Sequence, residues 1–354
     1  MKDMMKSFDE IFDDVTKYGT KIKTDEYHEF GRHLIIDQGQ EEIAGYTDLE
    51  VGLYDNVPAV LFGAHTRVVK YVDKPFFLGA DGVKILKSKL AGVNYKYLYY
   101  ALKNAKIPNT GYNRHFKWLK EIKFKYPDPY TQDKIVNILD KLTGIIGFRK
   151  QEIRKLDDLV KTRFVELFGD PVSNPMRWRK EQLQCNATLL NGRAYKQDEL
   201  LDSGKYPVLR VGNFFSNRSW YYSDLELDDD KYCDNGDLLY AWSASFGPRI
   251  WSGGKVIYHY HIWKVLVGEN YNKQFLCNLL DYVTASLMGE THGIGMMHLT
   301  KSGMEETEFI IPPMELQEQF ATFVKQTDKS KAAVQKSLDK LQKLFDKLMQ
   351  EYFG

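Results

Sequence analysis

Hydrophobic positions recur at seven-residue spacing in two segments of the chain, residues 127–169 and 312–354, which align with each other without a gap. Each segment carries two such apolar rows. Two rows at this period form a seam that packs against one partner helix, and the natural partner of each segment is the other copy. The sequence therefore predicts two long paired helices. Their rows comprise Ile135, Leu139, Leu142, Ile146, Ile153, Leu156, Val160 and Leu167 in the first copy, and Phe320, Val324, Val334, Leu338, Leu341, Phe345, Leu348 and Tyr352 in the second.

Identical residues fix the alignment of the two segments at both ends. Pro127, Gln132, Phe168 and Gly169 recur as Pro312, Gln317, Phe353 and Gly354. Gly169 tolerates the left-handed cap conformation and Pro171 cannot continue a helix, so we expect the first helix to end there. An internal repeat of this length divides the chain into a globular segment, a helix, a second globular segment and a second helix. The alternative is two ordinary amphipathic helices in the cores of separate domains.

The globular segments have the pattern of two diverged copies of one α+β domain. In the second segment, strands are expected at 206–211, 237–242, 255–267 and 308–311, with a helix at 272–287 and a glycine-rich stretch at 289–295. In the first, strands are expected at 32–36, 57–62, 82–86 and 122–126, with a helix at 94–103 and a loop at 107–113. The predicted boundaries are therefore 1–126 for the first domain, 127–170 for the first helical region, 171–311 for the second domain and 312–354 for the second helical region.

Composition places limits on the class of protein. The 354 residues suffice for two domains with separate cores, and the 43% of hydrophobic residues indicate a globular chain. The formal net charge is only +1, so any nucleic-acid-binding face must be local and balanced by acidic stretches such as 224–230. Cys185, Cys233 and Cys277 lie far apart, as expected of reduced cytosolic thiols. Neither a signal-peptide core nor a run of 18 apolar residues occurs, which predicts a cytoplasmic protein without membrane contact.

Motifs of enzyme chemistry are incomplete in this sequence. No Gly-rich nucleotide loop follows a strand, and neither a His-Glu-x-x-His helix nor a Gly-x-Ser-x-Gly elbow occurs. Residues 128–130, Asp-Pro-Tyr, resemble the signature of amino-methyltransferases with one proline missing, and we interpret them as a strand-to-helix corner. His259 and His261 alternate along a predicted strand without a third metal ligand, which favours one face of a sheet over a metal site. These patterns predict a protein without catalytic or metal-binding residues.

The layout and several motifs resemble the specificity subunit of type I restriction-modification enzymes. In that family, each long helix follows a strand that ends in a proline-rich step and a glutamine. Residues 311–319 match this step closely, and residues 126–132 match it loosely. Trp178-Arg179 and residues 189–193 are similar to the start of the family's recognition domain, whereas residues 8–12 only approximate the corresponding opening of the first domain.

This resemblance implies an α+β protein in which two target-recognition domains are separated by two long antiparallel coiled-coil helices with a pseudo-twofold internal repeat. Each domain would read one half of a bipartite, asymmetric site in double-stranded DNA, and the paired helices would set the unread gap. Two adenine-N6 methyltransferase subunits, which bind S-adenosylmethionine, would dock on the helices. Restriction and translocase subunits that use ATP and Mg would join them, so that this chain itself would bind no cofactor. The expected location is the prokaryotic cytoplasm, in association with the nucleoid.

Two other classes of function remain open from the sequence. One is a two-headed scaffold that binds DNA, RNA or proteins outside restriction-modification. The other is a self-contained methyltransferase or nuclease, which the missing cofactor loop disfavours.

Candidate DNA-binding residues are polar side chains on the loops of each domain. Base edges are read by Arg, Asn, Gln, Ser, Thr or His, whereas Lys and Arg hold phosphates. In the first domain the candidates are Lys21, Lys23, His65, Thr66, Arg67, Tyr112, Asn113, Arg114 and His115. In the second domain they are Arg193, Tyr195, Lys196, Arg210, Asn213, Ser243, Ser245, Arg249, His292, Met296 and His298.

Overall fold

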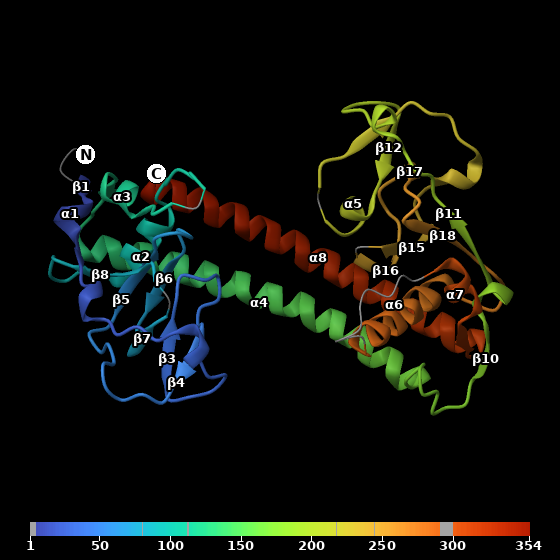
Figure 1. Cartoon of the computed structure of the whole chain (residues 1–354), viewed down its shortest axis with the longest axis horizontal. Coiled ribbons are helices and arrows are strands. Elements are labelled where there is room, and N and C mark those ends of the chain that lie inside the picture. The colour runs from blue at the N-terminus through green and yellow to red at the C-terminus, as the bar shows by residue number, and fades with distance from the viewer. Residues whose placement is uncertain (1–4, 80, 112, 217, 244, 291–299) are drawn as a thin grey trace. The chain divides into compact units, whose positions relative to one another are not determined.

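The computed structural model describes residues 5–354 except 80, 112, 217, 244 and 291–299. The chain forms two compact units (Figure 1), one made of Met1–Gln151 with Gln335–Gly354 and the other of Glu152–Val334. Each unit contains one α+β domain and half of each of the two long helices, α4 (Pro129–Phe168) and α8 (Met314–Phe353). The unit boundaries therefore fall within the helices.

The α+β domain of the first unit contains two main sheets. One has the order β2-β8-β5-β6 and is antiparallel throughout, and the other has the order β4-β3-β7, with β3 parallel to β7. A third, two-stranded sheet pairs β1 with β9 and so brings the start and the end of the domain together. The elements are β1 (Met5–Ser7), α1 (Phe8–Ile11), β2 (Phe12–Asp14), β3 (His33–Ile36), β4 (Gly45–Thr47), β5 (Ala59–Gly63), β6 (Val69–Val72), β7 (Phe76–Leu78), β8 (Val83–Ser88), α2 (Tyr95–Lys103), α3 (Phe116–Lys120) and β9 (Lys123–Lys125).

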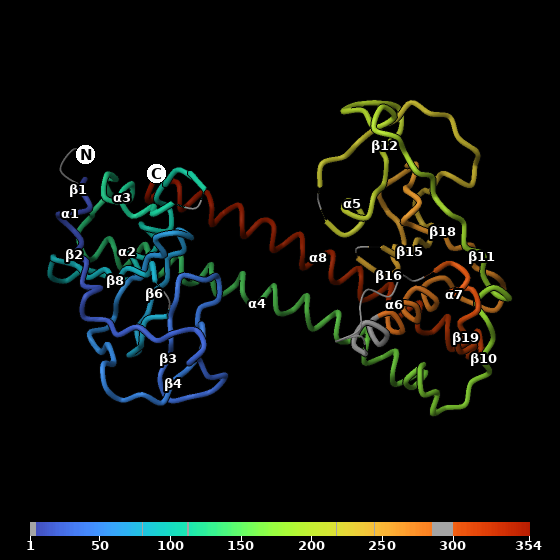
Figure 2. Tube along the Cα trace, in the orientation of Figure 1, coloured from blue at the N-terminus to red at the C-terminus, as the bar shows by residue number. Residues whose placement is uncertain are grey.

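The second unit repeats this strand order. Its antiparallel sheet is β11-β18-β15-β16, its mixed sheet is β13-β12-β17-β14 with β12 parallel to β17, and β10 pairs with β19 (Figure 2). The elements are β10 (Arg179–Gln182), β11 (Ala187–Asn191), β12 (Tyr206–Leu209), α5 (Val211–Phe215), β13 (Tyr221–Ser223), β14 (Tyr232–Cys233), β15 (Leu238–Ser243), β16 (Ser245–Ile250), β17 (Val256–Tyr258), β18 (Ile262–Val267), α6 (Lys273–Glu290), α7 (Lys301–Glu306) and β19 (Glu308–Ile311). The two domains are thus copies of one topology, and the predicted α+β class is confirmed.

The long helices pack together inside each unit with their directions opposed. In the first unit, Ile135 and Leu139 near the start of α4 share a core with Phe345 and Met349 near the end of α8. In the second unit, the end of α4 and the start of α8 share a core in the same way. Every residue of the predicted apolar rows is buried or half-buried. Burial of these rows is the main source of stability for helices of this length, because propensity alone is weak.

A buried glutamine joins each long helix to the domain that precedes it. Gln317 donates from Nε2 to the carbonyl oxygens of Pro312 and Asn270, at 2.8 and 3.0 Å, and accepts from the backbone N–H of Asn272 at 2.9 Å. Asn272 in turn caps α6, because its side chain accepts from the amides of Gln274 and Phe275. A single side chain thereby couples a strand end, a helix cap and the first turn of α8.

The first unit contains the same joint. Gln132 donates to the carbonyl of Pro127 at 2.9 Å and accepts from the backbone N–H of Asn94 at 3.1 Å. Asn94 caps α2 through the amides of Lys96 and Tyr97. Both glutamines are fully buried. Asp128 also contributes to this corner, because it accepts from the amide and the hydroxyl of Thr131 at 3.1 and 2.6 Å. The Asp-Pro-Tyr sequence is therefore a helix-capping corner, as the sequence predicted.

In each unit, an aromatic residue in the last turn of a long helix contacts the main helix of the α+β domain. Phe353 in the last turn of α8 meets Tyr97 of α2, with ring centroids 5.1 Å apart. Phe168 in the last turn of α4 meets Phe275 of α6 at 4.7 Å. Each domain helix therefore contacts the start of one long helix and the end of the other.

The predicted strand at 255–267 is wrong in one respect. It is two strands, β17 and β18, separated by a turn at His259–His261. β17 belongs to the mixed sheet and β18 to the antiparallel sheet. Both strands are mostly buried, so the apolar pattern continues across the point where the chain changes sheets. Strand β16, also unpredicted, pairs with β15 in a hairpin, and Arg249 lies on it, whereas Arg67 lies in the turn between β5 and β6.

We predict that Gln317→Ala lowers the free energy of unfolding of the second unit by roughly 1–3 kcal/mol, because the variant leaves buried backbone groups without partners. Hydrogen–deuterium exchange at the Asn272 amide should accelerate, since that N–H loses its acceptor. Gln319→Ala is the matched control, because Gln319 is exposed two residues further along α8. Equal protection of the Asn272 amide in both variants would contradict this role.

Candidate nucleic-acid interface

Three loops of the first domain meet around Gln38, a residue that the sequence analysis missed. Its side chain donates to the carbonyl of Asp81 at 2.9 Å and accepts from the amide of His65 at 3.1 Å, and its own carbonyl accepts from the Thr66 hydroxyl at 2.7 Å. Lys21 forms an ion pair with Asp81 at the same edge. Gly82 has φ +99°, and a Cβ there would lie 2.8 Å from His65 and 2.9 Å from Gln38, so the packing requires glycine. The structure thus brings Lys21, His65 and Thr66 together.

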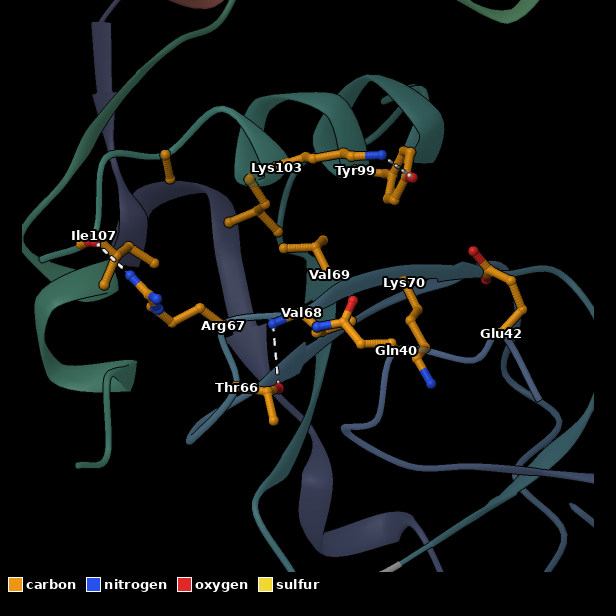
Figure 3. Close-up of a pocket in the computed structure, with 12 residues that line it drawn as sticks. Gln40, Glu42, Thr66, Arg67, Val68, Val69, Lys70, Tyr99, Lys103 and Ile107 are labelled. Carbon is orange, nitrogen blue, oxygen red and sulfur yellow. Dashed lines mark hydrogen bonds between the residues drawn. The ribbon is translucent and has the colours of Figure 1, made fainter. Parts of the chain in front are cut away.

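Arg67 is occupied with holding a loop in place. Its guanidinium donates to the carbonyl of Ile107 at 3.3 Å across a cleft of about 470 Å³ (Figure 3). Lys70 and Glu42 also line this cleft, and Lys70 is buried and forms an ion pair with Asp37 at 3.4 Å. Glu42 and the pairing of Lys70 with Asp37 offset part of the positive charge of this cleft, which makes it less suited to polyanions than its arginine and lysines suggest.

The remaining first-domain candidates differ in exposure. Lys23, Asn113 and Arg114 are exposed, and Asn113 donates to the carbonyl of Thr110 at 2.6 Å. His115 is 1% exposed, contacts the carbonyl of Ala64 at 3.2 Å and packs on Trp118, so its imidazole cannot reach a base in this conformation. His115 therefore lies in the core of the domain. Tyr112 lies outside the described residues.

In the second domain, the first loop is held by an ion pair. Arg193 binds both carboxylate oxygens of Glu199, at 2.7 and 2.9 Å, and lies over the ring of Tyr195. The Tyr195 hydroxyl contacts the carbonyl of Tyr258 at 3.4 Å. These two residues shape the loop from within. Lys196 is exposed beside them and leaves its ammonium open to solvent.

A cleft of about 650 Å³ gathers three further candidates of the second domain. Arg210 and Asn213 enter it from the end of β12 and from α5, and Ser243 enters from the end of β15. The turn between β17 and β18 adds His259 and His261, which the sequence analysis had assigned to a sheet face. In the sequence, these two histidines form a polar interruption in an apolar run. That interruption alone does not reveal which loops lie opposite them in the fold. Arg218, Ser219 and Tyr221 complete the polar lining.

The histidines of this cleft are held neutral. Burial, reinforced by His261 and Arg210, lowers the pKa of His259 to about 4. Burial and Arg210 also lower the pKa of His261. A desolvated imidazole beside a cation disfavours its charged form. The cleft therefore presents hydrogen-bonding rings beside an arginine at physiological pH.

Arg249 and Ser245 lie on the β15–β16 hairpin. Arg249 donates to the carbonyl of Phe214 at 2.5 Å and covers the rings of Phe214 and Phe215, so it supports α5 beneath the cleft. Ser245 is exposed opposite Ser243. His292, Met296 and His298 lie outside the described residues.

Two further properties concern only the part of the chain that the structure describes. There, no group of three or more His, Cys, Asp or Glu side chains is arranged to hold a metal ion. Among the same residues, no helix has both the length and the apolar character needed to cross a membrane.

Comparisons with known proteins agree with this architecture. The family described as "Type I restriction modification DNA specificity domain" matches residues 10–157 and 183–343, one match for each half of the repeat. The specificity subunit of the type I restriction enzyme EcoBI from Escherichia coli is 24% identical over 165 residues, which are 45% of this chain and 35% of that protein. The aligned part is thus about a third of that relative's length.

Solved structures share the fold. The S subunit of a type I restriction-modification system from M. genitalium has a TM-score of 0.62 at 18% identity, covering 99% of this chain and 96% of that one. A chain from a structure described as the basis of complex assembly and conformational transition of the type I R-M system has a TM-score of 0.55 at 13% identity, covering 98% and 95%. At these identities the likeness establishes the fold alone.

The chain belongs to the family of type I restriction modification DNA specificity domains. The family and the fold class predicted from the repeat and its proline-glutamine step are therefore confirmed.

We predict that His259 titrates near pH 4, which NMR of its imidazole can follow. Because this folded-state pKa lies below the ordinary 6.5, the unfolded chain takes up the proton first as the pH falls. The stability contributed by the neutral ring is complete above pH 6.5 and is lost between 6.5 and about 4. Arg210→Ala should raise the midpoint by removing a nearby cation, whereas Arg154→Ala on the exposed face of α4 should not. A wild-type midpoint at 6 or above would refute the environment described.

Proposed function

We propose that this chain is the DNA-reading subunit of a type I restriction-modification complex, and that each α+β domain reads one half of a bipartite, asymmetric DNA site. The supporting observation is the duplicated topology, in which each copy matches the specificity-domain family and offers a polar loop face at one end of its sheets. The ligand is double-stranded DNA. The two halves of the recognised sequence differ because the loops of the two domains differ.

In this proposal, catalysis resides in partner subunits. Two methyltransferase subunits would supply adenine-N6 methylation with S-adenosylmethionine, and restriction and translocase subunits would use ATP and Mg. The chain would bind none of these cofactors and would act in the cytoplasm, on the nucleoid. Family membership supports this division of labour.

The proposed DNA contacts are exposed or half-buried loop candidates, of which Lys21, Thr66, Asn113 and Asn213 also bind protein groups. In the first domain these are Lys21, Lys23, His65, Thr66, Asn113 and Arg114, and in the second Lys196, Arg210, Asn213, Ser243 and Ser245, joined by His259 and His261. Arg67, Arg193, Tyr195 and Arg249 would instead position the loops, because their polar groups already bind the protein.

We predict that the purified chain binds double-stranded DNA with an affinity that falls steeply as salt rises, because phosphate contacts release counterions. Alone it should neither methylate nor cleave. With the methyltransferase subunit added, long-read sequencing should detect adenine methylation at one interrupted sequence. Methyl transfer by the chain alone, or DNA binding that ignores salt, would overturn the proposal.

A second prediction concerns the independence of the two domains. Each domain has its own sheets and core clusters. Replacement of residues 175–310 by the second domain of another family member should therefore change one half of the methylated sequence and leave the other half as it was. The reciprocal exchange of the first domain is the matched control. If either exchange altered both halves, the domains would not read separately.

A further inference from the structure

Three of the polar side chains that line the second-domain cleft supply two donors and one acceptor. Arg210 is the first donor. It is exposed, it lies over the ring of Tyr221 with its guanidinium carbon 5.3 Å from the ring centroid, and it forms no ion pair with the described residues. This distinguishes it from Arg193 and Arg249, whose guanidinium groups are bound to Glu199 and to the Phe214 carbonyl. Arg210 is thus oriented by an aromatic face while its N–H edges remain available.

His259 is the second donor, because the protein fixes its tautomer. The backbone N–H of His261 donates to Nδ1 of His259 at 3.4 Å, so Nδ1 is an acceptor. A neutral imidazole carries one proton, and here that proton must lie on Nε2. The ring of Tyr195 stacks against His259 with centroids 6.4 Å apart and an interplanar angle of 28°, which restrains the orientation of the imidazole.

Asn213 supplies the acceptor. Its side-chain nitrogen donates to the carbonyls of Arg218 and Ser219, at 2.8 and 3.2 Å, so both of its N–H groups are engaged. Its side-chain oxygen accepts no hydrogen bond from the described residues and is free to accept one from a ligand.

The two donors and one acceptor of Arg210, His259 and Asn213 distinguish between the phosphates and the base edges of DNA. A phosphate presents only acceptors, and the Asn213 oxygen would oppose it. In the major groove, a G·C pair presents the N7 and O6 acceptors of guanine followed by the N4 amino donor of cytosine, whereas an A·T pair places its donor between two acceptors. Arg210 and His259 line the same cleft, close enough for the charge of Arg210 to act on the imidazole, so the two donors are neighbours. Two neighbouring donors match the adjacent N7 and O6 acceptors of guanine, whereas an A·T pair offers no two adjacent acceptors.

We propose that the cleft of the second domain reads a G·C base pair, with Arg210 and His259 donating to guanine and Asn213 accepting from the cytosine amino group. This inference rests on the proposed function of the chain and names the base pair that one cleft recognises. Arg210 and His259 would then be residues that determine specificity, while Tyr221, Tyr195 and His261 would position them.

The experiment begins with selection of bound duplexes from random double-stranded DNA by the full chain, followed by affinity measurements on the selected site. We expect one half-site to contain a guanine that Arg210→Ala no longer requires. Arg210 and His259 together make the bidentate contact to guanine, and such a contact discriminates by about 1–3 kcal/mol, so Arg210→Ala should lower the preference for that guanine by up to roughly 150-fold. Arg154→Ala is the matched control, because it removes a positive charge from the same unit outside the cleft.

A chemical variant of the DNA tests the contact without altering the protein. 7-Deazaguanine at the selected position removes the N7 acceptor, so it should weaken binding by the wild-type chain and have little further effect on Arg210→Ala. If Arg210→Ala weakened all sequences equally and reduced the salt slope by about one, Arg210 would be a phosphate contact and the inference would fail. If the wild-type chain showed no salt-dependent DNA binding, the proposed function itself would fail.

Discussion

The buried glutamine at the start of each long helix is the interaction on which the rest of the fold depends. The carbonyl that precedes a helix and the first amide of a neighbouring helix have no partners within regular structure. An amide side chain can serve both at once, because it donates from nitrogen and accepts at oxygen. Gln132 and Gln317 do this at equivalent corners. They fix the angle between a strand, a domain helix and a long helix. The orientation of the candidate DNA-binding loops relative to the long helices depends on that angle.

The repeat was predictable because its determinants are local in sequence. Seven-residue rows, the recurrence of Gln132 as Gln317 and the terminal glycine all survive divergence of the domains between them. The roles of the loop residues were not predictable, because most of them depend on a partner that is distant in sequence. Arg193 is bound by Glu199, but Arg249 is bound by a carbonyl 35 residues away, and His115 is buried by contact with Ala64. The turn at His259 was not predictable from the apolar pattern, because the strands on both sides of it are buried and therefore equally apolar.

The nearly neutral net charge of the chain bears on how a member of this DNA-specificity family binds its ligand. Arg67, Arg193 and Arg249 support loops from the inside, and of these three only Arg193 is paired with a carboxylate. The 49 Lys and Arg residues of the chain are matched by 48 Asp and Glu residues. Such a surface gives less of the sequence-independent phosphate attraction that dominates basic proteins, and leaves a larger share of binding to base edges.

The contact between Phe353 and Tyr97 has a consequence for how the protein is made. The core of the first domain includes Phe345, Met349 and Phe353, so it is completed by residues that are translated after the whole second domain. The second unit, in contrast, is made of one continuous segment, residues 152–334. Domains usually fold in the order of synthesis. The first domain departs from this order, because the surface of α2 that packs against the end of α8 stays uncovered until the last turns of α8 have been synthesised.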